Sequence, residues 1–231
     1  MANTTDHLAG SPFAGRLLDA IMQYSMLKHP FYVAWSEGKL SQPVLAEYAK
    51  QYYAHVRAFP TYVSAVHSHC DDLQVRRMLL ENLIEEERGE DNHPELWLRF
   101  AEGLGVSRDE VNAARLLPST TRSVNTFKSL TARPDYREGL AALYAYESQI
   151  PEVAHTKRSG LRDFYGIDDP AAVSFFTVHE SADQIHRQVE AKALNDQCET
   201  DGVRDRVVAA AAEGAKALWD FLDGIQAAYL N

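Results

Sequence analysis

Helical periodicity runs through almost the whole chain, and this pattern restricts the fold more than any other feature. Apolar residues recur at helical spacing, whereas no hairpin signal and no glycine-rich strand-to-helix turn occurs. Prolines and glycines divide the periodic segments and mark where helices begin and end. We expect helices over residues 12–28, 41–59, 60–71, 73–87, 107–116, 119–132, 136–165, 170–196 and 202–228, and a further one through Trp97 to Gly103.

These segments predict a single all-α domain that spans residues 1–231. No internal repeat, low-complexity linker or shift in composition marks a boundary between domains. Residues 1–11 have the composition of a frayed tail. Ser11 followed by Pro12 is typical of an N-cap with proline at the first helical position.

Two further prolines predict where helices end. The residue before a proline avoids the helical region, so His29 should end the first helix at Pro30. Residues 31–39 then form a short aromatic connection. Pro60 should likewise end the helix that begins at residue 41.

Composition and charge exclude several classes of partner. The formal net charge is −10, and lysines and arginines are interspersed with no basic block, which argues against nucleic acid or an anionic membrane surface. No apolar run is long enough to cross a bilayer, and the N-terminus lacks a secretory signal. Cys70 and Cys198 have no paired spacing, so we expect reduced thiols in a cytoplasmic protein.

Three residues with metal-binding side chains share one helix face near the C-terminal end. His179, Asp183 and His186 stand at positions i, i+4 and i+7. A helix turns by about 100° per residue, so the three fall within an arc of about 60°. Two imidazoles and a carboxylate are half the ligand set of a dinuclear iron or manganese site.

Two other segments carry ligands for the second half of such a site. Glu86 and His93 are seven residues apart, and the glycine and proline between and after them divide the segment at a turn. Glu147 stands in an otherwise apolar and aromatic segment, where a carboxylate is costly to bury unless a cation meets it. Pro151 cannot donate to the carbonyl of Glu147, so it should kink the helix over residues 136–165.

A ferritin-like arrangement is an alternative reading of the same residues. Glu90 with His93 is a Glu-x-x-His pair, and Asp183 with His186 is its aspartate analogue. That arrangement uses Glu90 in place of Glu86 and leaves His179 as an additional ligand. The additional histidine favours a different helical scaffold.

The motifs resemble one family specifically. Glu86 with His93, Tyr146-Glu147-Ser148-Gln149-Ile150-Pro151, and His179-x-x-x-Asp183-x-x-His186 are similar to the six-ligand pattern of the haem-oxygenase-like di-metal oxidases. Within that superfamily the chain most resembles the chlamydial protein associating with death domains (CADD) and its bacterial relatives. The likeness runs from about His29 to Leu194 and includes Phe31-Tyr32-Val33-x-Trp35, Tyr52-Tyr53-x-His55 and His67-Ser68-x-Cys70-Asp71-Asp72.

The resemblance implies a fold, cofactors and a reaction. The fold is a seven-helix haem-oxygenase-like bundle, related to PqqC and TenA, and the expected assembly is a homodimer. CADD-like proteins are 4-aminobenzoate synthases that use two metal ions, Fe/Fe or Mn/Fe, with dioxygen and an external reductant. By resemblance, the six metal ligands are Glu86, His93, Glu147, His179, Asp183 and His186.

The resemblance also implies that the protein is consumed as its own substrate. Tyr32 corresponds to the residue that supplies the aromatic ring, and Lys157 to the residue that supplies the amino group. Tyr146 is a candidate for relaying an electron or a hydrogen atom. A further tyrosine of the family pattern is Phe175 in this chain, which puts any radical route through that hydroxyl in doubt.

Two alternative functions stay open on the sequence alone. The first is a PqqC-like di-metal oxidase that acts on an external small amine or acid. The second is a protein-binding module of the death-domain type, suggested by the name of the chlamydial relative. Multiple turnovers and an enlarged pocket would favour the first, and capture of a death domain would favour the second.

Overall fold

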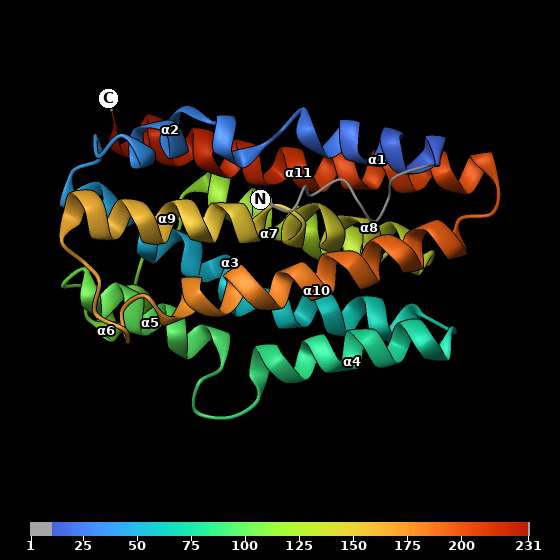
Figure 1. Ribbon diagram of the computed structural model, residues 1–231, viewed down its shortest axis with the longest axis horizontal. Helices are drawn as coiled ribbons and strands as arrows, with labels where there is room; N and C mark the ends of the chain where they lie inside the picture. The colour runs from blue at the N-terminus through green and yellow to red at the C-terminus, as the bar shows by residue number, and fades with distance from the viewer. Residues whose placement is uncertain (1–10, 231) are drawn as a thin grey trace.

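The computed structural model describes residues 11–230, apart from the side chains of residues 181–185. Within this part, the chain forms eleven α-helices and one short 3-10 helix, with no strand (Figure 1). The all-α class is confirmed, with eleven helices among the described residues where the resemblance implied seven. They are α1 (Pro12–Met22), α2 (Pro30–Ser36), α3 (Gln42–His69), α4 (Leu73–Glu87), α5 (His93–Gly103), α6 (Arg108–Asn112), α7 (Pro118–Thr131), α8 (Tyr136–Glu147), α9 (Ile150–Tyr165), α10 (Ser174–Gln197) and α11 (Asp201–Tyr229), with the 3-10 helix at Met26–Lys28.

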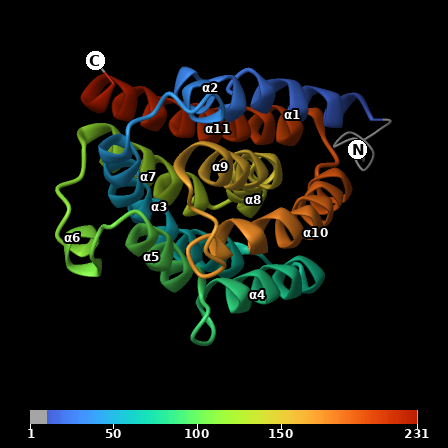
Figure 2. The same ribbon diagram turned by 60° about the vertical axis from the view of Figure 1, so that its left-hand side comes forward.

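Helices α8 and α9 lie at the centre of the bundle, and the other long helices surround them (Figure 2). α8 packs against α3, α7, α10 and α11. Every residue from Gly139 to Glu147 is buried, which is the pattern of a helix enclosed on all sides. No helix in the described part of the chain is both long and apolar enough to cross a membrane.

The segment expected as an aromatic connection is helix α2. The first helix ends at Met22, earlier than predicted. His29 does end the following 3-10 turn, but it also caps α2, because its Nδ1 accepts a hydrogen bond of 3.0 Å from the backbone N–H of Phe31. Pro30 occupies the first helical position, where its missing N–H has no intrahelical partner to lose. The proline therefore starts a helix as well as ending one, and it places Tyr32 in a buried turn of α2.

A close approach holds α2 against α9. A Cβ built on Gly160 would lie 2.7 Å from Cδ1 of Trp35, so only glycine leaves room for that indole. The Trp35 Nε1 donates a hydrogen bond of 3.2 Å to the carbonyl of Lys157. The contact fixes Tyr32, on the same short helix as Trp35, beside Lys157.

The prediction that Pro60 ends a helix is wrong, because α3 continues through it to His69. The proline removes one backbone hydrogen bond, yet the helix is buried on both sides of it, at Val56 and Phe59 before and Tyr62 after. Packing on the bundle outweighs the lost bond. The helix expected over residues 107–116 is also shorter and ends at Asn112.

The expected kink between Glu147 and Lys157 is a complete break. α8 ends at Glu147, and α9 begins at Ile150 with Pro151 in its first turn. Gln149 lies in the break, and its side-chain Oε1 accepts a hydrogen bond of 2.8 Å from the backbone N–H of Met26. A proline in a first turn costs no intrahelical hydrogen bond, so a new helix begins there at little cost.

Candidate metal centre

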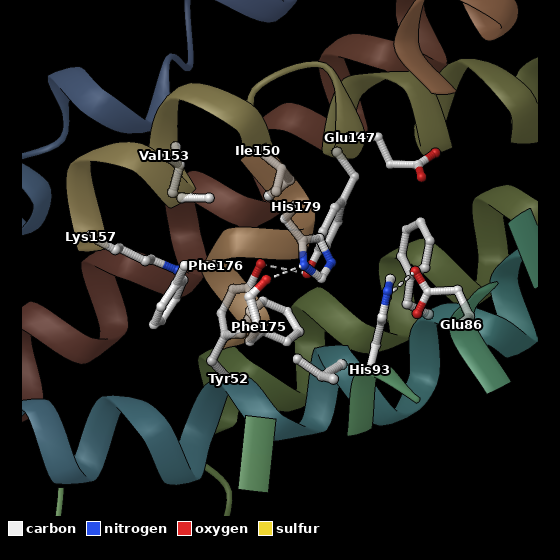
Figure 3. Close-up of a pocket in the computed structure, with 14 residues that line it drawn as sticks. Tyr52, Glu86, His93, Glu147, Ile150, Val153, Lys157, Phe175, Phe176 and His179 are labelled. Atoms are coloured by element: carbon white, nitrogen blue, oxygen red, sulfur yellow. Dashed lines mark hydrogen bonds and ion pairs between the residues drawn. The ribbon is translucent and has the colours of Figure 1, made fainter. Parts of the chain in front are cut away.

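Glu86 and His93 lie on either side of the turn that joins α4 to α5 (Figure 3). Asn92 caps α5 by accepting a hydrogen bond of 3.0 Å from the N–H of Glu95, which places His93 as the first residue of the helix. The His93 Nδ1 lies 2.8 Å from Glu86 Oε1, and both side chains are buried. Burial raises the pKa of Glu86, and His93 opposes that rise.

His179 approaches this pair from α10. Its ring lies 4.3 Å from the ring of His93 and stacks on Phe175 at 4.0 Å, measured between centroids. The His179 Nδ1 lies 2.6 Å from the carbonyl oxygen of Phe175, so Nδ1 carries the proton and Nε2 keeps its lone pair for a ligand. Burial, followed by repulsion from His93, lowers the pKa of His179 well below its usual value, which keeps the ring neutral.

Glu147 and His186 form a second cluster at the end of α8. Glu147 Oε1 accepts a hydrogen bond of 2.9 Å from Asn82 Nδ2 and lies 3.3 Å from His186 Nδ1. The other nitrogen of His186 lies 3.1 Å from Oε2 of Glu85. Burial alone would raise the pKa of Glu147, but the hydrogen bond and charge of His186 outweigh it and lower the pKa.

The two clusters belong to one site. Ligand atoms of Glu86, His93 and His179 lie within 4.8 Å of one another, and the charges of Glu147 and His186 both act on the pKa of Glu86. The structure thus brings together five of the six predicted ligands. The sixth, Asp183, is on α10, and its side chain lies outside the described residues.

The residues present fit a pair of metal ions. Glu147 Oε2 is buried and has no hydrogen-bond partner in the described part of the chain, and a buried carboxylate oxygen in that state favours a cation. Imidazole with carboxylate is a donor set that suits iron and manganese. Glu90, the residue of the ferritin-like alternative, is exposed, and its carbonyl accepts a hydrogen bond from Arg99.

Lys157 lies beyond the ligands and is joined to Tyr32 through one hydroxyl group. The Lys157 Nζ lies 2.7 Å from the Tyr48 hydroxyl oxygen, which lies 2.9 Å from that of Tyr32. Lys157 and Tyr32 are both almost completely buried. Burial, with the charge of Tyr52 adding to it, raises the pKa of Tyr32 well above its usual value, so its phenol remains protonated.

Two opposing effects act on the charge of Lys157. Five aromatic rings lie within 4.6 to 5.6 Å of its Nζ and favour the ammonium form. Such contacts contribute about 0.5–2 kcal/mol, whereas removing an ammonium ion from water costs several kcal/mol. Burial therefore dominates and lowers the pKa of Lys157 well below its usual value, which favours a neutral amine.

Tyr146 pairs with a second tyrosine beside the cavity. Its hydroxyl donates a hydrogen bond of 2.6 Å to that of Tyr52, and the ring of Tyr52 stacks on that of Tyr48 at 5.5 Å. Phe175, which replaces the family tyrosine, stacks on His179. At this position the chain offers an apolar ring in place of a hydroxyl.

The ligands and Lys157 line the same small cavity. Figure 3 shows Lys157 at one end, Glu86 and Glu147 at the other, and His179 between them. The cavity volume is about 30 Å³, which is room for roughly two water-sized molecules. Its polar lining residues are Tyr52, Glu86, His93, Tyr146, Glu147, Lys157 and His179.

Four buried residues of the site were not among those expected from the sequence. Tyr48 and Tyr52 are four residues apart on α3; Tyr52 lines the cavity, and Tyr48 accepts a hydrogen bond from Lys157. Asn82 is four residues before Glu86 on α4, and Glu190 is four residues after His186 on α10. Both spacings place a residue one turn from a predicted ligand on the same face, and that is the signal that finds them.

Comparison with known proteins connects this geometry to a family. The family model for iron-containing redox enzymes of the haem-oxygenase type matches residues 46–219. The chain is 41% identical to the 4-aminobenzoate synthase of Nitrosomonas europaea, over 96% of this chain and 94% of that protein. It is 45% identical to the 4-aminobenzoate synthase of Chlamydia muridarum, over 89% of this chain and 87% of that protein.

A solved structure agrees with the fold. The TenA homologue from Pseudomonas syringae superposes with a TM-score of 0.83, covers 97% of each chain and is 15% identical. At that identity the likeness shows the architecture alone.

Proposed function

Because the chain belongs to the haem-oxygenase-like family of iron-containing redox enzymes, and within it to the group of the 4-aminobenzoate synthases, we propose that it forms 4-aminobenzoate in an oxygen-dependent reaction. Tyr32 supplies the aromatic ring and Lys157 the amino group, so each chain reacts once. The product serves folate biosynthesis. Dioxygen is the oxidant, and an external reductant supplies the remaining electrons.

The metal ligands in this proposal are the residues that meet at the cavity. Glu86, His93 and His179 would hold one ion and Glu147 and His186 the other, with Asp183 completing the set from α10. An Fe/Fe or Mn/Fe pair bound there supplies the electrons that activate dioxygen. Around it, the Phe175 carbonyl holds His179 in the tautomer that presents Nε2, and Asn82 orients Glu147.

One observation carries the proposal: a single hydroxyl group, that of Tyr48, contacts both residues that the reaction would consume. In tyrosine the hydroxyl is para to Cβ, and in 4-aminobenzoate the amino group is para to the carboxyl carbon. The nitrogen must therefore bond to the ring carbon that carries the Tyr32 hydroxyl, whose oxygen leaves as water, and the Cε–Nζ bond of Lys157 must break. At the other end of the ring the Cα–Cβ bond must break, and dioxygen oxidises Cβ to the carboxyl group. The amine of Lys157 lies at the hydroxyl end, 5.4 Å from the ring centroid.

Protonation states support the same roles. Burial lowers the pKa of Lys157, so its Nζ keeps a lone pair for attack on an oxidised ring. Burial raises the pKa of Tyr32, so its phenol must lose a proton together with an electron, and the hydrogen bond to Tyr48 offers that proton an acceptor.

The pair of Tyr146 and Tyr52 connects the metal end of the cavity to Tyr48 and Tyr32. Tyr146 is the residue directly before Glu147 in the chain. Tyr146 and Tyr52 both line the cavity, whereas Tyr32 does not. An electron from Tyr32 passes by way of Tyr48 and Tyr52, whose rings stack. Tyr146 serves as a relay in this route, and Phe175 takes no part in it.

An external substrate fits the site less well. Pockets for small molecules generally occupy about 300–1,000 Å³, whereas this cavity is about 30 Å³. It has room for dioxygen and water but not for an aromatic amine or acid. The size of the cavity favours a substrate that is part of the protein itself.

The test is reconstitution without oxygen, with Fe(II) alone and with Fe(II) plus Mn(II), followed by air and a reductant. Mass spectrometry should find at most one equivalent of 4-aminobenzoate per chain and a matching loss of mass from Tyr32 and Lys157. Protein labelled with ring-¹³C tyrosine should give labelled product.

Variants locate the source of the product. We expect Tyr32→Phe to give none and Tyr48→Phe to give at least tenfold less, because the amine loses its contact with the Tyr32 hydroxyl. Tyr62→Phe is the matched control, since Tyr62 is also fully buried but donates its hydrogen bond to the Val124 carbonyl. Equal yields from wild type and Tyr32→Phe would show that the ring comes from elsewhere.

A further inference from the structure

The helix that carries Tyr32 is too short to be stable by itself. α2 has seven residues, whereas isolated helices shorter than about 12–15 residues are marginal in water. It lies on the outside of the bundle and packs against α9 and α11 (Figure 2). The position of Tyr32 therefore depends on the contacts that hold this one helix in place.

His29, the residue directly before α2, makes two of these contacts with one ring. Its Nδ1 accepts a hydrogen bond of 3.0 Å from the backbone N–H of Phe31, so the proton of the neutral ring is on Nε2. The Nε2–H donates to Oδ1 of Asp223 on α11, at 3.0 Å. Trp219, one turn earlier on α11, packs its ring against that of His29 with 4.6 Å between centroids. The imidazole thus caps α2 and ties it to α11 at the same time.

Tyr32 lies midway between this contact and the one at the other end of the helix. It is three residues after His29 and three before Trp35, whose Nε1 donates to the Lys157 carbonyl. The Tyr32 hydroxyl meets that of Tyr48 at 2.9 Å only while both ends of α2 are held. Release of the His29 end would leave Tyr32 fixed from one side alone.

Only the neutral form of His29 makes both hydrogen bonds. In an imidazolium ion both nitrogens are donors, so an Nδ1–H would face the N–H of Phe31 and the cap would be lost. Burial lowers the pKa of His29, and the hydrogen bond and charge of Asp223 oppose this effect without cancelling it. The ring is therefore neutral at pH 7.

The titratable groups around the His29 ring are few. Asp223 contacts it from α11, and Lys216 on the same helix interacts with the charge of Asp223. Lys28 precedes His29 in the chain, and Tyr24 contacts the Trp219 ring on its other neighbour, with 6.4 Å between centroids. Of these groups, Asp223 is the one that acts on the pKa of His29.

We propose that His29 is a positioning residue for Tyr32: its neutral ring holds α2 in place, and protonation of the ring releases the helix. The inference deepens the proposed function and rests on it only for what the position of Tyr32 serves. In a released α2 the imidazole is exposed and has a pKa of about 6.5, above its value in the held helix. Release is therefore favoured as the pH falls below about 6.5, by no more than about tenfold between pH 7.5 and pH 5.5.

Hydrogen exchange of the α2 amides tests this role. Exchange is followed by mass spectrometry of peptides over residues 30–38 in the full-length, metal-free protein and corrected for the chemical exchange rate at each pH. Asp223→Ala removes the tie and keeps the cap, and we expect faster exchange at pH 7.5 by about 2- to 10-fold. His29→Asn also keeps a cap and should match it. His29→Ala loses both contacts and should exchange faster still, by a further factor of about 2 to 30.

The pH dependence separates the hydrogen bonds from simple packing of the ring. Exchange in wild type should rise relative to His29→Asn as the pH falls from 7.5 to 5.5, because asparagine does not titrate. The other histidines are shared and cancel in this ratio. Ser11→Ala is the matched control, since Ser11 caps α1 through a hydrogen bond of 3.1 Å to the N–H of Ala14; it should speed exchange in α1 and leave α2 unchanged.

A packing role for the ring predicts a different pattern. If His29→Asn and His29→Ala exchange alike, or Asp223→Ala exchanges like wild type, the hydrogen bonds do not hold α2 and the proposal is refuted. A wild type that changes with pH in parallel with His29→Asn refutes it as well. Should His29→Ala fail to fold, wild type, His29→Asn and Asp223→Ala still decide, because the Asp223 side chain is 60% exposed.

The outcomes for the two proposals can be distinguished. Exchange is measured on the unreacted protein, so a failure to form 4-aminobenzoate would refute the proposed reaction and leave the result for His29 standing. Exchange rates that contradict the role of His29 would leave the proposed reaction untouched.

Discussion

Replacing Lys157 with methionine should stabilise the metal-free protein, and the gain should grow as the pH falls. Lys157 is 2% exposed, and burial lowers its pKa well below the usual value. In the unfolded chain the lysine has a pKa of about 10.4, so below that pH the unfolded state binds a proton that the folded state does not. The buried amine therefore costs nothing above the unfolded pKa, and its cost increases as the pH falls toward the folded pKa.

The size of the effect follows from one proton. Each pH unit between the two pKa values changes the free energy of unfolding by about 1.4 kcal/mol. Between pH 9.5 and pH 7.5 the difference between Lys157→Met and wild type should therefore grow, by no more than about 2.7 kcal/mol, which is the limit for one proton over two pH units. Loss of the hydrogen bond to Tyr48 subtracts a term of about 1 kcal/mol that does not change with pH in this range.

The assay is urea denaturation of both proteins in the presence of a chelator, at several pH values from 7.5 to 9.5. The other titrating groups are shared, so they cancel in the difference between the two proteins. Lys128→Met, at an exposed position on α7, is the control for replacing a lysine that is not buried. If the free energies of unfolding of Lys157→Met and wild type change with pH in parallel, the amine is charged in the folded protein. That result would refute the role of Lys157 as a neutral nucleophile.

Two further predictions concern the metal ligands and the packing of α2. His179→Ala should leave the metal-free fold intact but lower metal content by at least one ion per chain, measured by elemental analysis after loading without oxygen; full occupancy would remove His179 from the ligand set. Gly160→Ala should lower the free energy of unfolding by about 1–3 kcal/mol, because the new methyl group would meet the Trp35 indole at 2.7 Å. Gly202→Ala, whose Cβ meets nothing within 4 Å, is its control in urea denaturation, and equal stabilities of the two variants would contradict the close approach.

The ligand residues could be predicted because their spacing is a local rule. His179 and His186 fall on one face of any helix that contains them, whatever surrounds that helix. Pairing Glu86 with His93 required only the prediction that a turn separates them, and the Asn92 cap lies in that turn. Spacing alone did not choose between Glu86 and Glu90, and burial of Glu86 in the bundle makes that choice.

The helix boundaries at prolines could not all be predicted, because proline has two opposite effects. Pro30 and Pro151 each stop one helix and also fit the first turn of the next, and the local sequence does not say whether a second helix follows at once. Pro60 is tolerated inside α3 because buried neighbours on both sides hold the helix together. The packing energy that holds α3 together at Pro60 comes from contacts with other helices, and the local sequence gives no signal of it.

The break between α8 and α9 explains how residues of one sequence segment serve both ends of the cavity. Lys157 is ten residues after Glu147, which on a straight helix is a separation of about 15 Å along the axis, and no helical face would be shared. Residues 148–149 divide the segment into two helices, and Pro151 lies in the first turn of the second one, where it loses no hydrogen bond. The carboxylate then faces the ligands of α4, α5 and α10, while the amine faces α2 and α3, where Tyr32 and Tyr48 lie. Glu147 and Lys157 line the same cavity of about 30 Å³ from two successive helices, so one segment of the sequence supplies both a metal ligand and the amine of the proposed reaction.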